Sequence, residues 1–248
     1  DVPSLLDILR KPYADRIFAI DWQQSQLQKK DSGATIISNA GNESVRINSQ
    51  LTVLAAGKGN GELLQKLDVK KPAMQLRPLQ QVMVRHRHHH ALYAHCVGTD
   101  SKPRLTISSH RDGEYTVWYL GGQLAEEGAS LPPDILIERA RKELQTLFSW
   151  LDWTEAEWAT LPVERAEPAQ PGMLRPDNAW LSACEGLTHC VVAWPTKLTL
   201  VPNLGNLLID YLTQRTIVPL RNDKIPSGFL QLDTIAPTPW QHPEWKKV

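Results

Sequence analysis

The 248-residue chain carries 27 Lys and Arg against 27 Asp and Glu, and 42% of its residues are hydrophobic, as in an ordinary globular protein with one or two cores. The zero net charge and the lack of a long basic run argue against a nucleic-acid or acidic-membrane partner. The sequence shows no apolar stretch of the roughly 18 residues that a membrane span needs, no signal peptide and no C-x-x-C pair among its three cysteines. We therefore expect a cytoplasmic protein without a disulfide framework or a cysteine zinc site.

The first 50 residues predict a helix, a strand and a hairpin. Apolar spacing places the helix over residues 4–14, and a strand is expected over 16–20. Two short β-prone runs, 34–38 and 44–48, are joined by a turn-forming Asn-Ala-Gly-Asn stretch and predict the hairpin.

An apolar run over residues 51–54 then leads into the small residues Ala55, Ala56 and Gly57. Side chains of this size let a backbone come within van der Waals contact of a flat ligand, and glycine also accepts positive φ. The same pattern fits a tight turn into a helix, so both interpretations stay open at this point.

Residues from about 77 onward predict an antiparallel sheet and a helix that packs on it. Asp112–Gly113 is expected to form a two-residue hairpin turn. Pro132 and Pro133 suit a first helical turn, and apolar residues then recur at helical spacing as far as Leu147. The expected strands cover residues 80–85, 92–96, 104–108 and 115–119.

Three tryptophans, Trp150, Trp153 and Trp158, follow this helix at the start of a further strand over residues 158–165. Core and interface packing is the favoured role of this group, and substrate contact is the alternative. After a Pro- and Gly-rich crossing, a second buried strand, a turn and a helix are expected over residues 188–212.

The helix of that second segment is expected to begin with Thr199 as its N-cap and Pro202 in its first turn. A helix N-terminus has unpaired N–H groups and a partial positive charge, so it favours an anion. Lys197 would add a full positive charge at this place, although a solvated loop lysine is the simpler interpretation.

The run Arg85–His90, with His95 nearby, is a candidate metal site. Imidazoles at His86, His88 and His90 would project from one face of a strand, and three such ligands could bind zinc, nickel or copper. The run lacks a carboxylate or cysteine at a defined spacing, so a solvated and partly charged loop is favoured over a metal site.

Four segments, taken in order, resemble the D-amino-acid oxidase superfamily of FAD-dependent oxidoreductases: Leu51–Gly59, Trp118–Glu126, Gly172–Asp177 and 188–202. The resemblance covers most of the chain and is to the C-terminal part of such a protein. The family's N-terminal Gly-x-Gly-x-x-Gly element, which holds the FAD pyrophosphate, does not occur in the sequence.

The resemblance implies an α/β fold with an α+β insertion, in which a partial FAD-binding sheet domain is interleaved with an antiparallel β substrate domain carrying a packed helix. The expected domains are 1–75, the second half of the FAD-binding domain; 76–170, the antiparallel substrate domain; 171–225, the return to the FAD-binding domain; and 226–248, a C-terminal tail.

The implied activity is oxidation of an amine, amino acid or related small substrate by hydride transfer to flavin N5. The chain alone is expected to be inactive and to need the missing N-terminal FAD-binding segment as its partner. The alternatives are a flavin-free binding domain derived from this fold and, less favoured, a His-rich metal-binding module. The upstream coding sequence would discriminate between the flavin-dependent and flavin-free alternatives.

The resemblance also implies two catalytic candidates. Arg175, in Gly172-Met-Leu-Arg-Pro176, would hold a substrate carboxylate with its planar guanidinium, unless it pairs with a structural carboxylate. Lys197 would stabilise negative charge on the reduced flavin. Glycines often fill this turn in the family where the present chain has Trp194–Lys197. The implied cofactor-binding residues are Ile17, through its backbone toward the adenine, and Ala55, Ala56, Gly57, Trp194, Pro195, Thr196, Lys197, Leu198 and Thr199.

Overall fold

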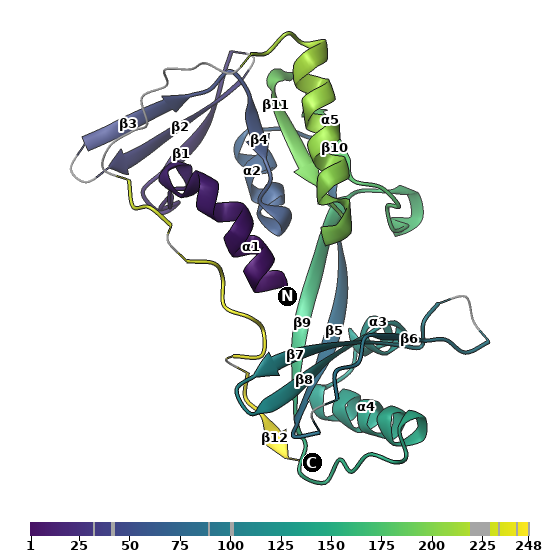
Figure 1. Cartoon of the computed structure of the whole chain (residues 1–248). Coiled ribbons are helices and arrows are strands. Elements are labelled where there is room, and N and C mark those ends of the chain that lie inside the picture. The colour runs from purple at the N-terminus through teal and green to yellow at the C-terminus, as the bar shows by residue number, and fades with distance from the viewer. Residues whose placement is uncertain are drawn as a thin grey trace. The chain divides into compact units, whose positions relative to one another are not determined.

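The computed structural model describes residues 1–31, 33–40, 43–88, 90–99, 102–218, 229–232, 234–241 and 243–247 (Figure 1). The chain divides into two compact units. One, which we call the parallel-strand unit, consists of Ile8–Arg77 and Arg165–Thr234. The other, the antiparallel unit, consists of Asp1–Asp7, Pro78–Glu164 and Ile235–Val248.

The parallel-strand unit is built around a sheet with the strand order β10-β11-β4. β10 (Trp180–Cys184) and β11 (Leu187–Trp194) form an antiparallel hairpin. β11 also pairs in parallel with β4 (Thr52–Leu54), and Val192 lies opposite Leu54 in that pairing. Residues 190–194 of β11 are all buried, as expected for a strand covered on both faces.

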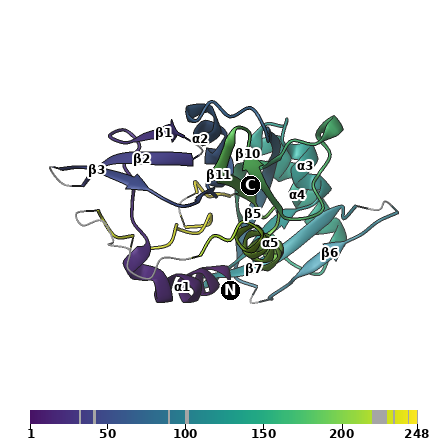
Figure 2. The same cartoon turned by 90° about the horizontal axis from the view of Figure 1, so that it is seen from above.

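A second sheet in this unit is an antiparallel meander of β1 (Gln26–Lys30), β2 (Gly33–Ala40) and β3 (Glu43–Asn48), seen side by side in Figure 2. Its second hairpin confirms the predicted pairing, with Ser38 opposite Val45. α2 (Asn60–Lys66) follows β4. The buried apolar core of the unit includes Leu27, Ala34, Leu54, Leu64, Leu67, Leu187, Cys190, Val192 and Trp194.

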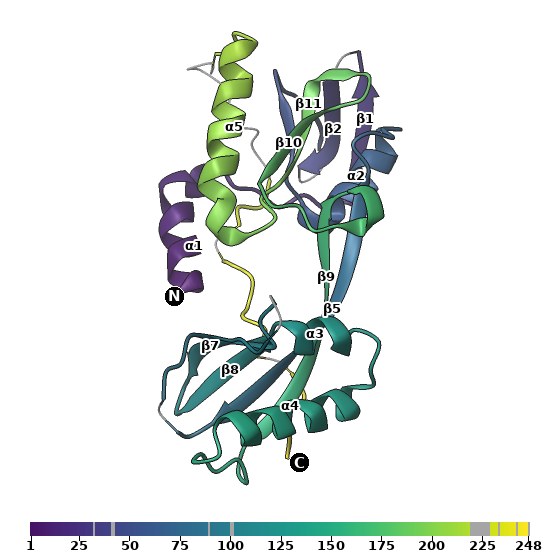
Figure 3. The ribbon, with the colours of Figure 1, turned by 90° about the vertical axis from the view of Figure 1, so that its right-hand side faces the viewer.

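α5 (Val201–Gln214) lies alongside β10 and β11 (Figures 1 and 3). Pro202 stands in its first turn, as predicted, where a missing N–H leaves no helical bond unmade. The Tyr211 hydroxyl donates a hydrogen bond of 3.0 Å to the Thr188 carbonyl and ties the helix to β11. Its half-buried residues recur at helical spacing: Leu204, Leu207, Leu208, Tyr211 and Leu212.

The antiparallel unit contains most of a six-stranded sheet with the order β12-β9-β5-β8-β7-β6. The strands are β5 (Met74–His86), β6 (Ala94–Cys96), β7 (Leu105–Asp112), β8 (Tyr115–Gly121), β9 (Glu157–Pro168) and β12 (Lys246–Lys247). Residues of β5 up to Arg77 and of β9 from Arg165 belong to the parallel-strand unit.

α3 (Gln123–Gly128) and α4 (Pro133–Leu147) pack on this sheet, as Figure 3 shows. The predicted apolar stripe of α4 is confirmed, because Leu136, Ala140 and Leu144 are completely buried. The strand residues that meet these helices and the nearby tryptophans include Val82, Val84, Leu105, Ile107, Trp118, Leu120 and Trp158.

The C-terminal residues of the chain dock on the antiparallel unit. The Trp240 ring stacks on His110 with centroids 4.1 Å apart, and the Arg85 guanidinium lies 4.7 Å from the centre of the Trp245 ring. The segment ends with Lys246 and Lys247 paired to β9. The described part of the expected C-terminal tail is therefore docked on the antiparallel unit.

The structure differs from the predicted elements at several places, for physical reasons. Residues 16–20 form no strand: Arg16 ends a 3-10 turn that begins at Lys11, after α1 (Val2–Arg10), and Phe18 makes only an isolated bridge to Gln231. Pro12 cannot donate a backbone hydrogen bond, which accounts for the early end of α1.

The β7–β8 hairpin turn lies one residue later than predicted. Asp112 pairs with Tyr115, so the two loop residues are Gly113 and Glu114, and Gly113 has φ +62°. Thr199 is not the N-cap of α5, contrary to the prediction. Leu200 holds that place, without a side-chain cap, and Thr199 lies in the 3-10 turn before it.

The mixed α/β fold with antiparallel sheets is confirmed. In the described part of the chain, none of the helices is both long and apolar enough to cross a bilayer.

Packing of α4 on the sheet leads to a stability prediction. Leu136 is 0% exposed and its neighbour Ile135 is 58% exposed, on the same helix. We expect Leu136→Ala to lower the free energy of unfolding by about 2–5 kcal/mol, because it leaves a cavity, and Ile135→Ala to cost less than about 1 kcal/mol. Urea unfolding followed by tryptophan fluorescence measures both. Equal losses for the two variants would contradict the packing of α4.

Candidate functional site

The parallel pairing of β4 and β11 brings two predicted cofactor segments together. Parallel strands end at the same edge of a sheet, so Ala55–Gly57 after β4 lie beside Trp194–Lys197 at the end of β11. A direct bond joins them, because the Trp194 indole N–H donates to the Gly57 carbonyl at 3.2 Å. In open α/β sheets, ligands bind outside the carboxyl ends of parallel strands, and this edge is such a place.

The first of these segments presents bare backbone. Ala55, Ala56 and Gly57 are all exposed. Gly57 has φ +56°, which an L side chain rarely adopts, and no heavy atom lies within 4 Å of the point where a Cβ would stand. The backbone here is therefore open to a ligand, and the bulk of larger side chains would close it.

Asn60 joins the two segments by hydrogen bonds, and this role was not predicted from the sequence. Its side chain is fully buried, its Oδ1 accepts the Ala56 N–H at 2.8 Å, and its Nδ2 donates to the Ala193 carbonyl at 3.1 Å. One amide thus binds the ends of both strands. A turn-forming asparagine directly after Gly57-Lys-Gly59 was the available signal, but it does not reveal a bond to a residue 133 positions away.

The second segment is a strained turn. Thr196 has φ +60°, uncommon for a β-branched residue, and its hydroxyl donates to the Asn178 carbonyl at 3.1 Å. The Lys197 N–H bonds back to the Pro195 carbonyl at 2.7 Å. The structure therefore holds Pro195 and Thr196 at the strand edge, in contact with the chain that leads from Arg175 to β10.

Lys197 and Arg175, the two catalytic candidates, lie at the protein surface. Each is exposed, and neither forms an ion pair within the described residues. The alternative that Arg175 pairs with a structural carboxylate finds no support there. Leu198 and Thr199 are also exposed, in the 3-10 turn that precedes α5.

The backbone groups of Ile17 bond to parts of the chain other than this edge. Its N–H bonds to the Ala14 carbonyl at 3.5 Å, and its own carbonyl accepts the Leu232 N–H at 3.0 Å. Both backbone groups are thus engaged within the chain, and a bond to adenine would have to share or replace one of them. The role of Ile17 stays a prediction.

The histidine run does not form the row on one strand face that the metal-site alternative requires. β5 ends at His86, so His88 and His90 lie beyond it. The His86 ring packs edge-on against Trp118 and Trp153, with centroids 5.0 and 5.5 Å away, and the His88 ring contacts the Asp152 carbonyl. Of the residues whose positions are given, no three His, Cys, Asp or Glu come together as a metal site, and His89 lies outside them.

The three predicted tryptophans near these histidines differ in burial. Trp153 and Trp158 are buried in the core of the antiparallel unit, whereas Trp150 is 75% exposed. Core packing is thus confirmed for two of the three.

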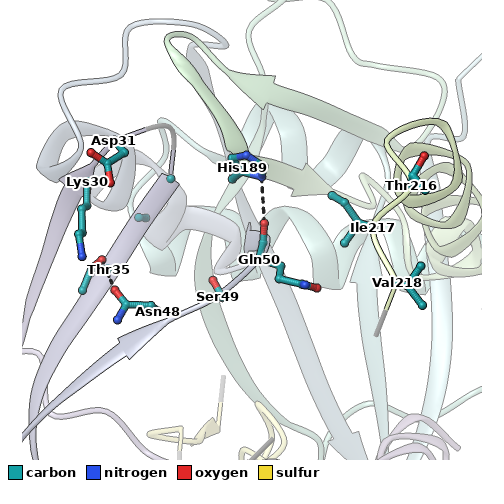
Figure 4. A pocket seen from close by; sticks show the side chains of 12 residues that line it. Lys30, Asp31, Thr35, Asn48, Ser49, Gln50, His189, Thr216, Ile217 and Val218 are labelled. Atoms are coloured by element: carbon teal, nitrogen blue, oxygen red, sulfur yellow. Dashed lines mark hydrogen bonds between the residues drawn. The ribbon is translucent and has the colours of Figure 1, made fainter. Parts of the chain in front are cut away.

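A cavity of about 410 Å³ in the parallel-strand unit lies elsewhere (Figure 4). Its lining includes Ser49 and Gln50 before β4 and His189 near the start of β11, so it opens at the amino ends of the parallel strands. His189 Nδ1 lies 3.1 Å from the Gln50 carbonyl oxygen. Its position opposite to the carboxyl edge separates this cavity from the candidate cofactor site.

The chain is similar to proteins that are named as FAD-dependent oxidoreductases. No family model matches the chain. The chain is 40% identical over 250 residues to the probable FAD-dependent oxidoreductase PA4991 of Pseudomonas aeruginosa, covering 99% of this chain and 60% of that protein. The crystal structure of the FAD-dependent oxidoreductase PA4991 superposes with a TM-score of 0.83 at 38% identity, over 97% of this chain and 64% of that one.

The fold matches that of an FAD-dependent oxidoreductase. A more distant likeness, with a TM-score of 0.53 and 14% identity, is to the glycerol-3-phosphate dehydrogenase of Bacillus halodurans, solved in complex with FAD; it covers 81% of this chain and 39% of that one and shows the fold alone. PA4991 is named as FAD-dependent, which agrees with the cofactor predicted for this chain. The D-amino-acid oxidase superfamily stays a prediction, and the chain spans only 60% of the length of the PA4991 protein.

The geometry around Asn60 leads to the second prediction. Asn60→Ala leaves the Ala56 N–H and the Ala193 carbonyl without their partner, so we expect a loss of about 1–3 kcal/mol in the free energy of unfolding. Hydrogen exchange of the Ala56 amide should speed up as well. Asn203→Ala, at an exposed position of α5, is the matched control and should change neither. Unchanged exchange at Ala56 in the Asn60 variant would show that the amide does not hold this turn.

Proposed function

We propose that the chain forms most of an FAD-dependent oxidoreductase that oxidises an amine, an amino acid or a related small substrate, and that the carboxyl edge of β4 and β11 is its flavin site. The observation that carries the proposal is the juxtaposition of Ala55–Gly57 with Trp194–Lys197 at this edge, in a chain 40% identical to a protein named as an FAD-dependent oxidoreductase. The membership in the D-amino-acid oxidase superfamily is part of the proposal.

The residues at the edge fit a flat cofactor. The backbone at Ala55–Gly57 is exposed and free of bulk, and the position of a Gly57 Cβ is open space. When bound, FAD supplies the redox chemistry, the acceptance of a hydride from the substrate carbon. The protein then has to orient the substrate and to stabilise the negative charge that develops.

Lys197 is suited to stabilising this negative charge. Its ammonium group is exposed and without an ion-pair partner in the described chain, and its backbone leads into the 3-10 turn and α5. Together, an uncompensated cation and the amino end of a 14-residue helix give this turn a positive potential. Negative charge is therefore favoured beside it.

Arg175 is suited to orienting the substrate. A guanidinium group binds a carboxylate through two parallel charge-assisted hydrogen bonds, and that of Arg175 has no carboxylate partner within the described chain. The chain that follows it reaches the Thr196 turn through the bond to Asn178. We therefore assign Arg175 to the substrate carboxylate.

The second edge of β4 supports the need for a further segment. Among the described strands, β4 pairs only with β11, and Val53 is 36% exposed. An apolar strand with an open edge accepts another strand. We propose that this partner is an FAD-binding segment with a Gly-x-Gly-x-x-Gly turn, which would hold the pyrophosphate at a helix N-terminus.

The third prediction tests the flavin site directly. We expect the 248-residue chain alone to bind FAD weakly and the intact protein to keep it, because the pyrophosphate contacts come from the further segment. Flavin absorbance after dialysis measures both. Stoichiometric flavin on the 248-residue chain would contradict the need for that segment, and an intact protein that takes up no flavin would overturn the proposed function in favour of a flavin-free binding domain.

The fourth prediction concerns Arg175 in the intact enzyme. Arg175→Leu should cost about 2–4 kcal/mol in kcat/KM for a substrate with a carboxylate, since the bound anion loses a bidentate partner. Arg46→Leu is the matched control, at an exposed position of β3. Both variants should retain flavin. Wild-type kinetics for Arg175→Leu would remove this residue from the site.

A further inference from the structure

One buried side chain, that of Gln75, closes the loop that leads into Arg175. Gln75 lies in β5 and is 6% exposed. Its Oε1 accepts the Gln170 N–H at 2.9 Å, and its Nε2 donates to the Leu174 carbonyl at 2.9 Å. The two ends of the loop are thus held by one amide, and the peptide between Leu174 and Arg175 is fixed from β5.

The loop itself has little else to hold it. Gly172 and Met173 both have positive φ, +63° and +54°, a conformation that is unfavourable for a methionine. Met173 and Leu174 are 54% and 67% exposed, so burial of their side chains contributes little. Within the described chain, the backbone of the loop is held by two local turn bonds, from the Met173 and Leu174 N–H groups, and by the bonds of Gln75.

Glu167 sets the orientation of the Gln75 amide. The Gln75 Nε2 lies 3.4 Å from Glu167 Oε2, and a carboxylate only accepts, so the amide must turn its NH₂ toward Glu167 and its oxygen toward Gln170. Glu167 is 2% exposed and binds the Arg77 guanidinium through two bonds of 2.7 and 2.9 Å.

The charge on Glu167 is secured by the same contacts. Burial acts to raise the pKa of Glu167, but the hydrogen bond and charge of Arg77, together with the bond from Gln75, outweigh it and hold that pKa below its usual value. Glu167 is therefore ionised at neutral pH, and the donor and acceptor ends of Gln75 stay as described.

Arg175 is constrained from its other side as well. Pro176 follows it and is buried, and a residue before proline is restricted to extended backbone. The backbone at Arg175 is thus set by Gln75 on one side and by Pro176 on the other, while the guanidinium itself is exposed. A recognition group held in this way loses less conformational freedom when it binds.

We propose that Gln75 is the positioning residue for Arg175: by bonding both ends of loop 170–174 it presets the guanidinium for bidentate binding of the substrate carboxylate. The inference rests on the role that the proposed function gives Arg175. An amide is needed because Gln75 both accepts and donates. Glutamate at this position would lose the donor and repel Glu167, and leucine would make neither bond.

The test measures carboxylate binding to the intact flavoprotein, with benzoate as the probe and benzamide as its uncharged counterpart, from the change in flavin absorbance. Gln75→Leu should raise the Kd of benzoate about tenfold, because the loop is no longer preset, and leave that of benzamide unchanged. Gln75→Glu should behave in the same way. Gln65→Leu, at an exposed position of α2, is the matched control and should bind both probes like wild type.

A merely structural role is separated by the double variant. In an Arg175→Leu background, Gln75→Leu should raise the Kd of benzoate no further, because Gln75 acts through Arg175. In the 248-residue chain, hydrogen exchange at the Gln170 amide should speed up in Gln75→Leu and stay unchanged in Gln65→Leu, which tests the clamp without any flavin.

The two proposals fail in different ways. Weak binding of benzoate by Arg175→Leu together with wild-type binding by Gln75→Leu would overturn the role of Gln75 alone. Wild-type binding by Arg175→Leu, or no binding of benzoate by the unmodified protein, would overturn the role of Arg175 in the proposed function and the inference with it. Unchanged exchange at Gln170 in Gln75→Leu would overturn the clamp itself.

Discussion

The parallel pairing of β11 with β4 is the constraint on which the candidate site depends. It joins residues about 140 positions apart and sets Val192 opposite Leu54, so the two strands end at the same edge. Only then do the small residues after β4 meet the turn after β11, and only then can the Trp194 indole reach the Gly57 carbonyl. A shift of one residue in this pairing would turn Trp194 to the other face of the sheet, away from the core that it now completes.

The parts of the fold that the sequence predicted well are those with local causes. Helical spacing identified the buried stripe of α4, and two β-prone runs joined by an Asn-Ala-Gly-Asn stretch identified the β2–β3 hairpin. The small residues Ala55–Gly57 were recognised because their lack of bulk can be read from residue type alone. The comparison with PA4991 agrees with the cofactor that this reading implied.

The errors arose where long-range contacts or single-residue chemistry decided the result. Residues 16–20 have a β-prone sequence, but a strand needs a partner, and the structure offers this segment only the bridge from Phe18 to Gln231. Thr199 is a good capping residue by type, yet the chain first completes a 3-10 turn, so the N-cap is Leu200 and the helix begins at Val201. The row of imidazoles on one strand face, which was the less favoured alternative for the histidine run, does not form because β5 ends at His86 and that ring packs against Trp118.

The roles of Asn60 and Gln75 in the candidate site could not be predicted from the sequence, for the same physical reason. Asn60 and Gln75 are buried amides, each of which donates and accepts at once, and each joins segments that are far apart in the chain. Residue type says that an amide can do this but not where its partners are.

Lys197 and Arg175, the two exposed cations of the candidate site, are the opposite case. Their residue types suggested that they bind an anion, and neither forms an ion pair within the described residues. A buried amide that loses one hydrogen-bond partner is left unpaired away from water, whereas an exposed lysine or arginine stays hydrated. The amides therefore hold the shape of the candidate site, and the cations remain available to a ligand. The shape of the candidate site and its exposed charge thus come from different residues, and the shape comes from buried side chains that bond only within the chain in these contacts.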